Sequence, residues 1–188
     1  MSSPDMVSTT AFRETLARFA SGVTVVTAHG PNGPAGFTAT GFSSVSLAPP
    51  LVLVCVGKRA SAHDAVVAAP CFGVSILSEG QAWIADQFAR SGIDRFGGVP
   101  LLEVAGREHG VPLVDGAVGS LECRPHRRFD AGDHTILVGE VVATIVGAGR
   151  PLVHWARSFG AFVPAGVTPM AVARAASEQG GSTWANRS

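Results

Sequence analysis

The residues best suited to chemistry in this sequence are hydroxyl and basic side chains that could hold a phosphate. Hydroxyl groups are concentrated between Thr38 and Ser46, and Lys58, Arg59 and Ser61 follow at the start of a predicted helix. A helix N-terminus offers unpaired N–H groups and a favourable dipole, while basic and hydroxyl side chains add charge and hydrogen bonds. These segments could together bind a phosphate. From the residues alone there is a simpler explanation, in which Ser61 only caps its helix and Lys58 and Arg59 are solvated.

Common nucleotide and hydrolase motifs are absent from the sequence. Neither G-x-x-x-x-G-K-[ST] nor G-x-G-x-x-G occurs, so a nucleotide would have to be bound in another way. The histidines at positions 29, 63, 109, 126, 134 and 154 form no H-x-x-x-H or H-E-x-x-H pair, and no G-x-S-x-G elbow is present. Zinc and serine hydrolase functions therefore have no motif to support them, and we expect no metal.

Composition narrows the class of protein and its partners. The 188 residues are 46% hydrophobic and 15% charged, which is typical of one globular domain. Fourteen basic and 14 acidic residues cancel, so neither nucleic acid nor an anionic membrane is favoured as a partner. No signal peptide or membrane-spanning run is evident, and Cys55, Cys71 and Cys123 form no C-x-x-C pair. We expect reduced, buried cysteines and a cytoplasmic protein.

Short strands separated by turns must position these side chains. Hydrophobic periodicity predicts helices at 9–20, 61–69 and 79–90, and strands at 23–28, from about 35, and at 51–56, 71–77, 117–129, 134–146, 152–155 and 159–163. Pro125 indicates an edge or a bulge, and Gly132-Asp133 indicates a turn. Such short crossings favour an antiparallel barrel in residues 1–164. Residues 165–188 show little periodicity and are expected to form a mobile tail.

Several landmarks, taken in order, resemble the short-chain flavin reductases, which are components of two-component monooxygenases. They are Phe12-Arg13, Phe19 to Thr27, Gly36 to Ser46 with Pro49 to Leu51, Arg95-Phe96, Gly132 to His134, and Gly139 to Val141. The resemblance extends from about Phe12 to Phe162. It implies a mainly β fold, a six-stranded antiparallel Greek-key split β-barrel with flanking α-helices that binds FMN.

The resemblance also implies a reaction. The protein would be an NAD(P)H:flavin oxidoreductase that uses NADH or NADPH to reduce FMN or FAD by hydride transfer to flavin N5, with no catalytic residue of its own. It would form a homodimer and supply reduced flavin to a partner monooxygenase. An open barrel side and a low charge content are consistent with a second copy as partner.

Site residues follow from the same resemblance. Thr38, Ala39 and Thr40 would contact the isoalloxazine edge, Ser43 and Ser44 the ribityl and phosphate region, Cys55 and Val56 the pocket wall, and Lys58 and Ser61 the phosphate. The loop with Arg95 and Phe96 would lie against the flavin. His134, and Phe159 in the final strand motif, would lie on the nicotinamide side. Relatives often have Asn in place of Thr40 and Tyr in that final motif, and this chain has no Tyr.

Alternatives remain for single residues and for the whole chain. His134 could simply bond Asp133 within its turn, and Phe88 and Phe96 could be core residues. The chain could be a split-barrel protein that binds flavin without catalysis, which NADH oxidation would exclude. It could also resemble pyridoxamine-phosphate oxidases, although these usually need more basic residues for a second phosphate, and the Gly132 to His134 turn argues against this function.

Overall fold

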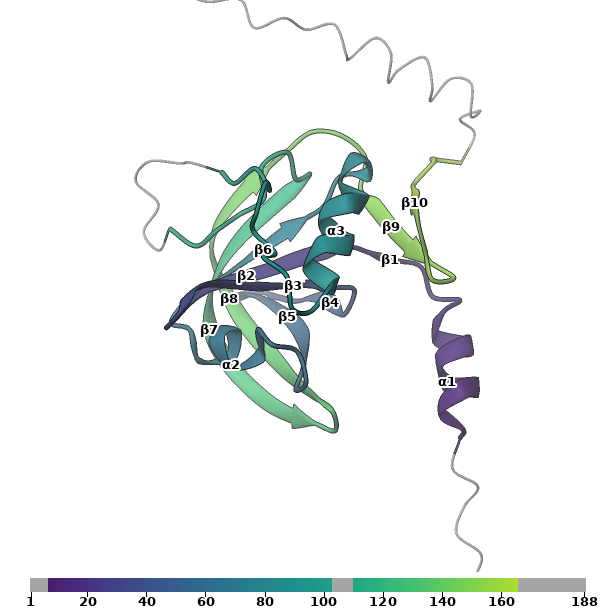
Figure 1. Cartoon of the computed structure of the whole chain (residues 1–188), viewed down its shortest axis with the longest axis horizontal. Coiled ribbons are helices and arrows are strands. Elements are labelled where there is room, and N and C mark those ends of the chain that lie inside the picture. The colour runs from purple at the N-terminus through teal and green to yellow at the C-terminus, as the bar shows by residue number, and fades with distance from the viewer. Residues whose placement is uncertain (1–6, 103–109, 166–188) are drawn as a thin grey trace, which may run out of the picture.

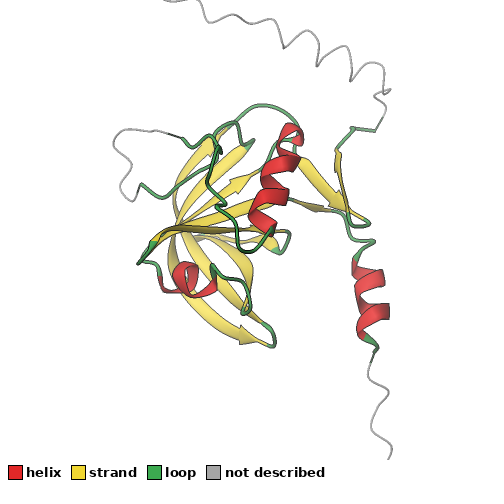
Figure 2. Cartoon of the chain, viewed as in Figure 1, coloured by secondary structure: helices red, strands yellow, loops and turns green. Residues whose placement is uncertain are grey.

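The computed structural model describes residues 7–102 and 110–165, so nearly all of the predicted tail lies outside the described residues. Strands dominate, and short helices flank them (Figures 1 and 2). The mainly β prediction is confirmed. The elements are α1 (Thr9–Leu16), β1 (Ser21–Gly22), β2 (Thr24–Gly30), β3 (Gly33–Ala39), β4 (Phe42–Leu47), β5 (Pro50–Gly57), α2 (His63–Ala68), β6 (Phe72–Ile76), the 3-10 helix η1 (Glu79–Gln81), α3 (Ala82–Ala89), β7 (Gly119–Ala131), β8 (His134–Val146), β9 (Leu152–Trp155) and β10 (Ser158–Ala161).

The strands form two sheets rather than one barrel of six strands. Seven antiparallel strands follow the order β3-β2-β6-β7-β8-β5-β4, and a smaller sheet has the order β1-β9-β10. No ladder joins β3 to β4 in the part of the chain that the structure describes, so the large sheet stays open. The prediction of six barrel strands is therefore wrong. The hydroxyl-rich run that begins near Ala35 forms two strands, and these lie at opposite edges of the sheet.

The connection between these two edge strands makes the sheet curl. β3 ends at Ala39 and β4 begins at Phe42, so only Thr40 and Gly41 link the two outermost strands. A link this short requires the two edges to approach one another at this corner. The Gly41 carbonyl also accepts a 2.8 Å hydrogen bond from the Cys55 N–H, which holds the corner against β5.

Alternation along the strands separates two apolar cores. Val26 and Ala28 of β2 pack inside the curled sheet with Phe72 and Leu137, whereas Val25 packs with the helix α3 cluster on the other face. A period of two places successive side chains on opposite faces of a strand. Both faces of β2 are therefore buried from Thr24 to Ala28.

The long hairpin of β7 and β8 follows the sequence prediction closely. Gly132 has φ +64°, a conformation that glycine adopts without strain, and it forms the predicted turn. The strand register shifts between Pro125 and Arg127, which confirms the predicted bulge. This hairpin carries His134 at a defined end of the sheet.

The helices differ more from prediction. Helix α1 ends at Leu16 rather than near Ala20, and it has no buried residue. Helix α2 begins at His63 without a side-chain cap, so the expected cap by Ser61 is wrong, while Ser78 and Gln81 form a capping box before α3. None of the described helices has the length and apolar character needed to span a membrane.

Candidate functional site

A cavity of about 460 Å³ lies at the corner where the sheet curls, and we call it the central pocket. Its walls come from β3 and the link to β4, from β5, from the end of α3 and the following loop, and from the first residue of β8. The lining residues are Phe37, Thr38, Ala39, Thr40, Gly41, Cys55, Gly57, Ala60, Phe88, Ala89, Ser91, Arg95 and His134. Predicted site residues from four separate segments therefore meet in one cavity: Thr38 to Thr40, Cys55, Arg95 and His134.

The strand β3 gives the central pocket polar backbone groups. It is an edge strand that pairs only with β2, with Val25 opposite Thr38 and Thr24 opposite Ala39. An edge strand leaves the N–H and C=O groups that point away from its partner without a strand partner. The Thr38 hydroxyl donates a 2.6 Å hydrogen bond to the Ala85 carbonyl of α3, which fixes β3 against the helix. A flat polar ligand in the pocket would therefore meet a rigid strand edge.

Arg95 places a positive charge at the boundary of the central pocket. Its Nε donates to the Arg90 carbonyl at 2.7 Å and its Nη1 donates to the Gly36 carbonyl at 2.9 Å. Gln87 of α3 holds this loop, because its Nε2 donates to the carbonyls of Arg95 and Gly97 at 3.0 and 2.9 Å. Gln87 lies within the helix predicted at 79–90, and its role in holding this loop was not predicted. The available signal was an amide on a largely apolar helix.

A second cavity of about 240 Å³, the adjoining pocket, shares Arg95 with the central pocket. Pro34, Ala35, Gly36, Ser61, Ala62, Ile93, Asp94, Arg95 and Phe96 line it. Ser61 and the Arg95 side chain thus border the same space, and together they provide a hydroxyl donor and a guanidinium. Phe96 also packs edge-on against Phe88, with ring centroids 5.0 Å apart, so it belongs to both the pocket wall and the core.

His134 lines the central pocket and also bonds its neighbour in the turn. Its Nδ1 lies 2.7 Å from Asp133 Oδ1. This hydrogen bond is the main cause that lowers the pKa of the Asp133 carboxyl below its ordinary value. An ionised acceptor favours a proton on Nδ1, which leaves Nε2 of the neutral ring as an acceptor. The bond to Asp133 agrees with the turn interpretation, and the nicotinamide-side role of His134 stays a prediction.

Lys58 lies at the β7–β8 turn, and it does not line either pocket. Its ammonium group donates to both carboxylate oxygens of Asp130 at 2.9 Å and to the Gly132 carbonyl at 2.6 Å. Its backbone N–H donates to the Asp133 carbonyl at 3.0 Å. The two bonds to Asp130 and the bond to the Gly132 carbonyl use all three donors of the ammonium group. In this arrangement Lys58 ties the loop after β5 to the turn that carries His134.

The structure does not bring four other predicted residues into these pockets. Val56 is fully buried in the inner core, so its side chain faces away from the central pocket. Ser43 and Ser44 lie exposed on the edge strand β4, where the Ser43 hydroxyl donates to the Ser44 carbonyl. Phe159 packs with the α3 cluster and against His154 in the small sheet.

Acid–base and metal chemistry have little support at this site. No group of His, Cys, Asp and Glu side chains that could hold a metal occurs among the residues described. All three cysteines are free, and burial raises the pKa of Cys71 and raises that of Cys123 to about 12. Cys55 borders the central pocket. The arrangement suits binding and alignment of flat, phosphate-bearing ligands better than proton transfer.

Comparison with known proteins gives a consistent result. Residues 16–162 match the model of the "Flavin reductase like domain" family. The chain is 49% identical over 134 residues to an "NADH-dependent FAD reductase" of Streptomyces globisporus, covering 69% of this chain and 72% of that one. It is 42% identical over 151 residues to an "FMN reductase (NADH)" of Agrobacterium fabrum, covering 80% and 84%.

Two further matches concern partners and ligands. A "4-nitrophenol 4-monooxygenase/4-nitrocatechol 2-monooxygenase, reductase component" of Rhodococcus opacus is 40% identical over 153 residues, covering 81% of this chain and 80% of that one. The solved structure of an NADH:FAD oxidoreductase of Streptomyces globisporus, in complex with NAD and FAD fragments, superposes with a TM-score of 0.78. The two sequences are 43% identical, and the match covers 84% of this chain and 94% of the other chain.

Proposed function

This chain belongs to the flavin reductase-like domain family, and we propose that the central pocket is where its reaction takes place. It is an NAD(P)H:flavin oxidoreductase that reduces FMN or FAD with a reduced nicotinamide. This location is supported by one observation: predicted site residues from separate segments line a single cavity. They are Thr38, Ala39, Thr40, Cys55, Arg95 and His134.

The residues present fit a flavin and a nicotinamide. The cofactors supply the redox chemistry themselves, as a hydride that passes from nicotinamide C4 to flavin N5. The protein has to align the two rings and exclude water. Backbone groups at the free edge of β3 are suited to the polar edge of the isoalloxazine, and Arg95 supplies a positive charge where negative charge accumulates on reduction. These groups are preorganised, because hydrogen bonds to Ala85 and Gly36 already hold them.

We assign the flavin phosphate to the adjoining pocket. Ser61 and Arg95 border that pocket together, and a guanidinium and a hydroxyl are strong phosphate ligands. Lys58, which the family resemblance places at the phosphate, has its ammonium bonded to Asp130 and Gly132. Its contribution is therefore expected to pass through the position of the β7–β8 turn.

His134 is the proposed contact of the nicotinamide. With Nδ1 bonded to Asp133, the Nε2 acceptor is available to the carboxamide N–H of a nicotinamide in the central pocket. Asp133 holds the ring in this orientation. Phe159 lies in the small sheet beyond these pocket walls, and the proposal gives it no direct contact with the nicotinamide.

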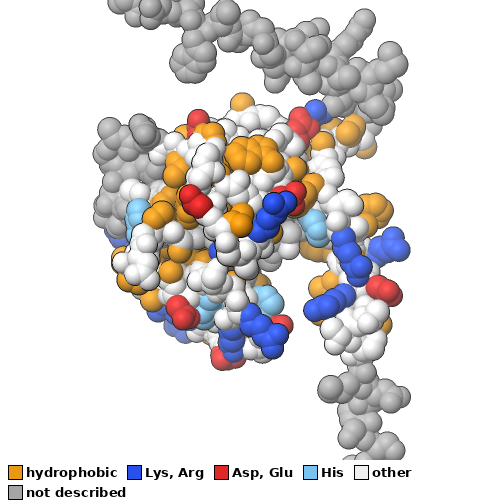
Figure 3. Space-filling view, viewed as in Figure 1, with side chains coloured by type: hydrophobic (Ala, Val, Ile, Leu, Met, Phe, Trp, Pro, Cys, Tyr) orange, Lys and Arg blue, Asp and Glu red, His pale blue; other side chains and the backbone are white. Residues whose placement is uncertain are grey.

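We propose a homodimer in which a second copy covers the helix α1 and its neighbours. Phe12 and Leu16 are each 55% exposed and Phe19 is 76% exposed, although all three are large and apolar. Figure 3 shows α1 at the lower right, set apart from the main body and carrying basic side chains beside apolar ones. Exposed apolar surface of this kind marks an association site.

A flavin-dependent monooxygenase is the proposed recipient of the reduced flavin. We also propose that the protein is located in the cytoplasm, since its three free cysteines are consistent with a reducing compartment.

The proposed function is tested by steady-state oxidation of NADH and NADPH with FMN, FAD and riboflavin as acceptors. We expect flavin-dependent turnover by the purified chain. His134→Ala should raise KM for NADH and leave flavin affinity nearly unchanged, whereas Phe159→Leu, a variant in the small sheet, should change neither constant. Flavin binding without any oxidation of NADH or NADPH would contradict the enzymatic function and support a binding protein.

A further inference from the structure

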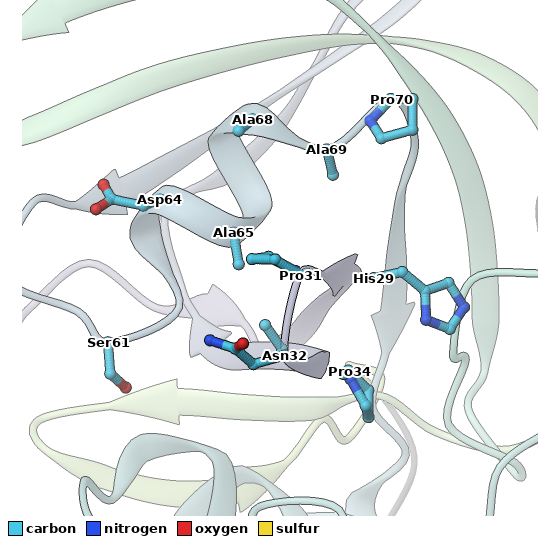
Figure 4. Close-up of a pocket in the computed structure, with 13 residues that line it drawn as sticks. His29, Pro31, Asn32, Pro34, Ser61, Asp64, Ala65, Ala68, Ala69 and Pro70 are labelled. Carbon is cyan, nitrogen blue, oxygen red and sulfur yellow. The ribbon is translucent and has the colours of Figure 1, made fainter.

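A third cavity, the hairpin groove, lies between the β2–β3 turn and helix α2 (Figure 4). Its volume is about 560 Å³. In Figure 4 the side chains of Ala65 and Pro31 lie close together at its centre, with Ser61 and His29 toward opposite ends. His29, Gly30, Pro31, Asn32, Gly33, Pro34, Ala35, Ser61, Asp64, Ala65, Ala68, Ala69 and Pro70 line the groove. Nothing in the reaction assigned to the central pocket requires this cavity.

The hairpin groove continues the path of the other two pockets. Arg95 borders both the central and the adjoining pocket, while Pro34, Ala35 and Ser61 border both the adjoining pocket and the groove. A ligand with its ring system in the central pocket and a phosphate at Ser61 would therefore direct any further group into the groove. FAD differs from FMN by an adenosine monophosphate attached at that phosphate.

The lining of the groove suits a purine nucleoside. Pro31, Pro34 and Ala68 offer apolar surface to the face of a base, and Asn32 places an amide with both a donor and an acceptor at its margin. Asparagine amides pair with the donor and acceptor edge of adenine in this way. Asp64 bonds His63 Nδ1 through Oδ1, at 2.7 Å, and a carboxylate has acceptor capacity left for ribose hydroxyls.

The groove is held in shape before any ligand arrives. Helix α2 approaches the hairpin so closely that a Cβ atom at Gly30 would lie 2.9 Å from the Ala65 Cβ. Gly33 has φ +107°, which side-chain-bearing residues rarely adopt, and it closes the turn that carries Asn32. The His29 ring also lies within hydrogen-bonding distance, 3.2 Å, of the Gly110 carbonyl. Preorganised walls lower the entropic cost of binding.

We infer that the hairpin groove binds the adenosine monophosphate part of a dinucleotide, and that this ligand is FAD. The inference rests on the proposed function, because the path begins with a flavin in the central pocket. NADH contains the same group. FAD is favoured because Ser61, the proposed phosphate ligand, joins the two cavities.

The test compares KM for FAD, FMN and riboflavin in the full chain and in two variants. Ala68→Leu fills the groove from an exposed position, and Asn32→Asp removes the amide donor while retaining a residue suited to the turn. Each should raise KM for FAD by about fivefold to tenfold, as expected for one lost polar or packing contact, and leave KM for FMN unchanged. Ala143→Leu adds the same side chain at an exposed position of β8 and should change nothing.

Further measurements show whether the adenosine comes from FAD or from NADH. They also separate failure of the groove inference from failure of the proposed function. If the variants change the KM ratio of NADH to reduced nicotinamide mononucleotide but not that of FAD to FMN, the groove binds the NADH adenosine instead. Two results together would overturn the inference. Neither variant would change the ratio of KM for FAD to KM for FMN, and Ala68→Leu would not weaken AMP binding measured by calorimetry. If the wild type reduces no flavin, the proposed function fails, and AMP calorimetry still decides the groove.

Discussion

Replacing Lys58 by methionine separates two roles for its ammonium group. Methionine keeps an unbranched apolar side chain but removes the charge and the hydrogen-bond donors. The change deletes the bonds from Lys58 to Asp130 and to the Gly132 carbonyl, while the backbone bond from Lys58 to Asp133 remains. The β7–β8 turn would lose its side-chain tie to the loop after β5, and His134 would be held less firmly at the central pocket.

The expected size of the effect follows from exposure. The side chains of Lys58 and Asp130 are 36% and 81% exposed, so water screens their attraction. An exposed ion pair contributes about 0.2–1 kcal/mol, and the bond to the Gly132 carbonyl adds about 0.5–1 kcal/mol. The two contributions together amount to at most about 2 kcal/mol. Since about 1.4 kcal/mol corresponds to a factor of ten, KM for NADH can rise by at most about thirtyfold, and we expect a rise of about fivefold.

The assay is steady-state NADH oxidation with FMN and riboflavin. We expect Lys58→Met to raise KM for NADH and Asp130→Asn to raise it less, because the bond from Lys58 to the Gly132 carbonyl remains in Asp130→Asn. Flavin constants should be unchanged in both variants, and Lys58→Arg should behave nearly as wild type. A rise in KM for FMN but not for riboflavin in Lys58→Met, with Asp130→Asn behaving as wild type, would refute the positioning role and assign the ammonium to the flavin phosphate.

Three further changes probe the phosphate site, the pocket wall and the dimer. Ser61→Ala should raise KM for FMN by about tenfold without affecting riboflavin, since a charge-assisted hydrogen bond contributes about 1.5–3 kcal/mol and part of it is screened; equal losses for both flavins would place the phosphate elsewhere. At pH 8 a thiol reagent should modify only Cys55 rapidly, because burial keeps the raised-pKa thiols of Cys71 and Cys123 protonated, and bound flavin should protect Cys55; an unprotected Cys55 would argue against a flavin in the central pocket. Leu16→Glu should convert the dimer to monomer in light scattering, and a wild-type monomer at micromolar concentration would contradict the dimer.

Local pattern predicted the elements of this fold well where one signal dominates. β8 and β9 have the predicted bounds, because apolar runs bounded by glycine or proline turns leave few alternatives. The number and pairing of strands could not be read in the same way. The break at Thr40 and Gly41, which separates the two edges of the sheet, carries no strong turn signal, and strand order depends on contacts between distant segments.

The candidate site shows the same division. Thr38 to Thr40 and His134 could be placed in it by family resemblance, and they line one pocket. Val56 does not line that pocket, because alternation along β5, with Cys55 facing the pocket, puts the next side chain in the core inside the curled sheet. The partners of Lys58 were not predictable, since Asp130 lies 72 residues further along the chain.

A flavin is expected to bind in the central pocket of this flavin reductase. A crystal structure of the chain with FAD tests it most directly. We expect the isoalloxazine against the β3 edge at Thr38 to Thr40 and beside Cys55, with the phosphate next to Ser61 and Arg95. A flavin bound elsewhere, with the central pocket filled by water, would contradict the account.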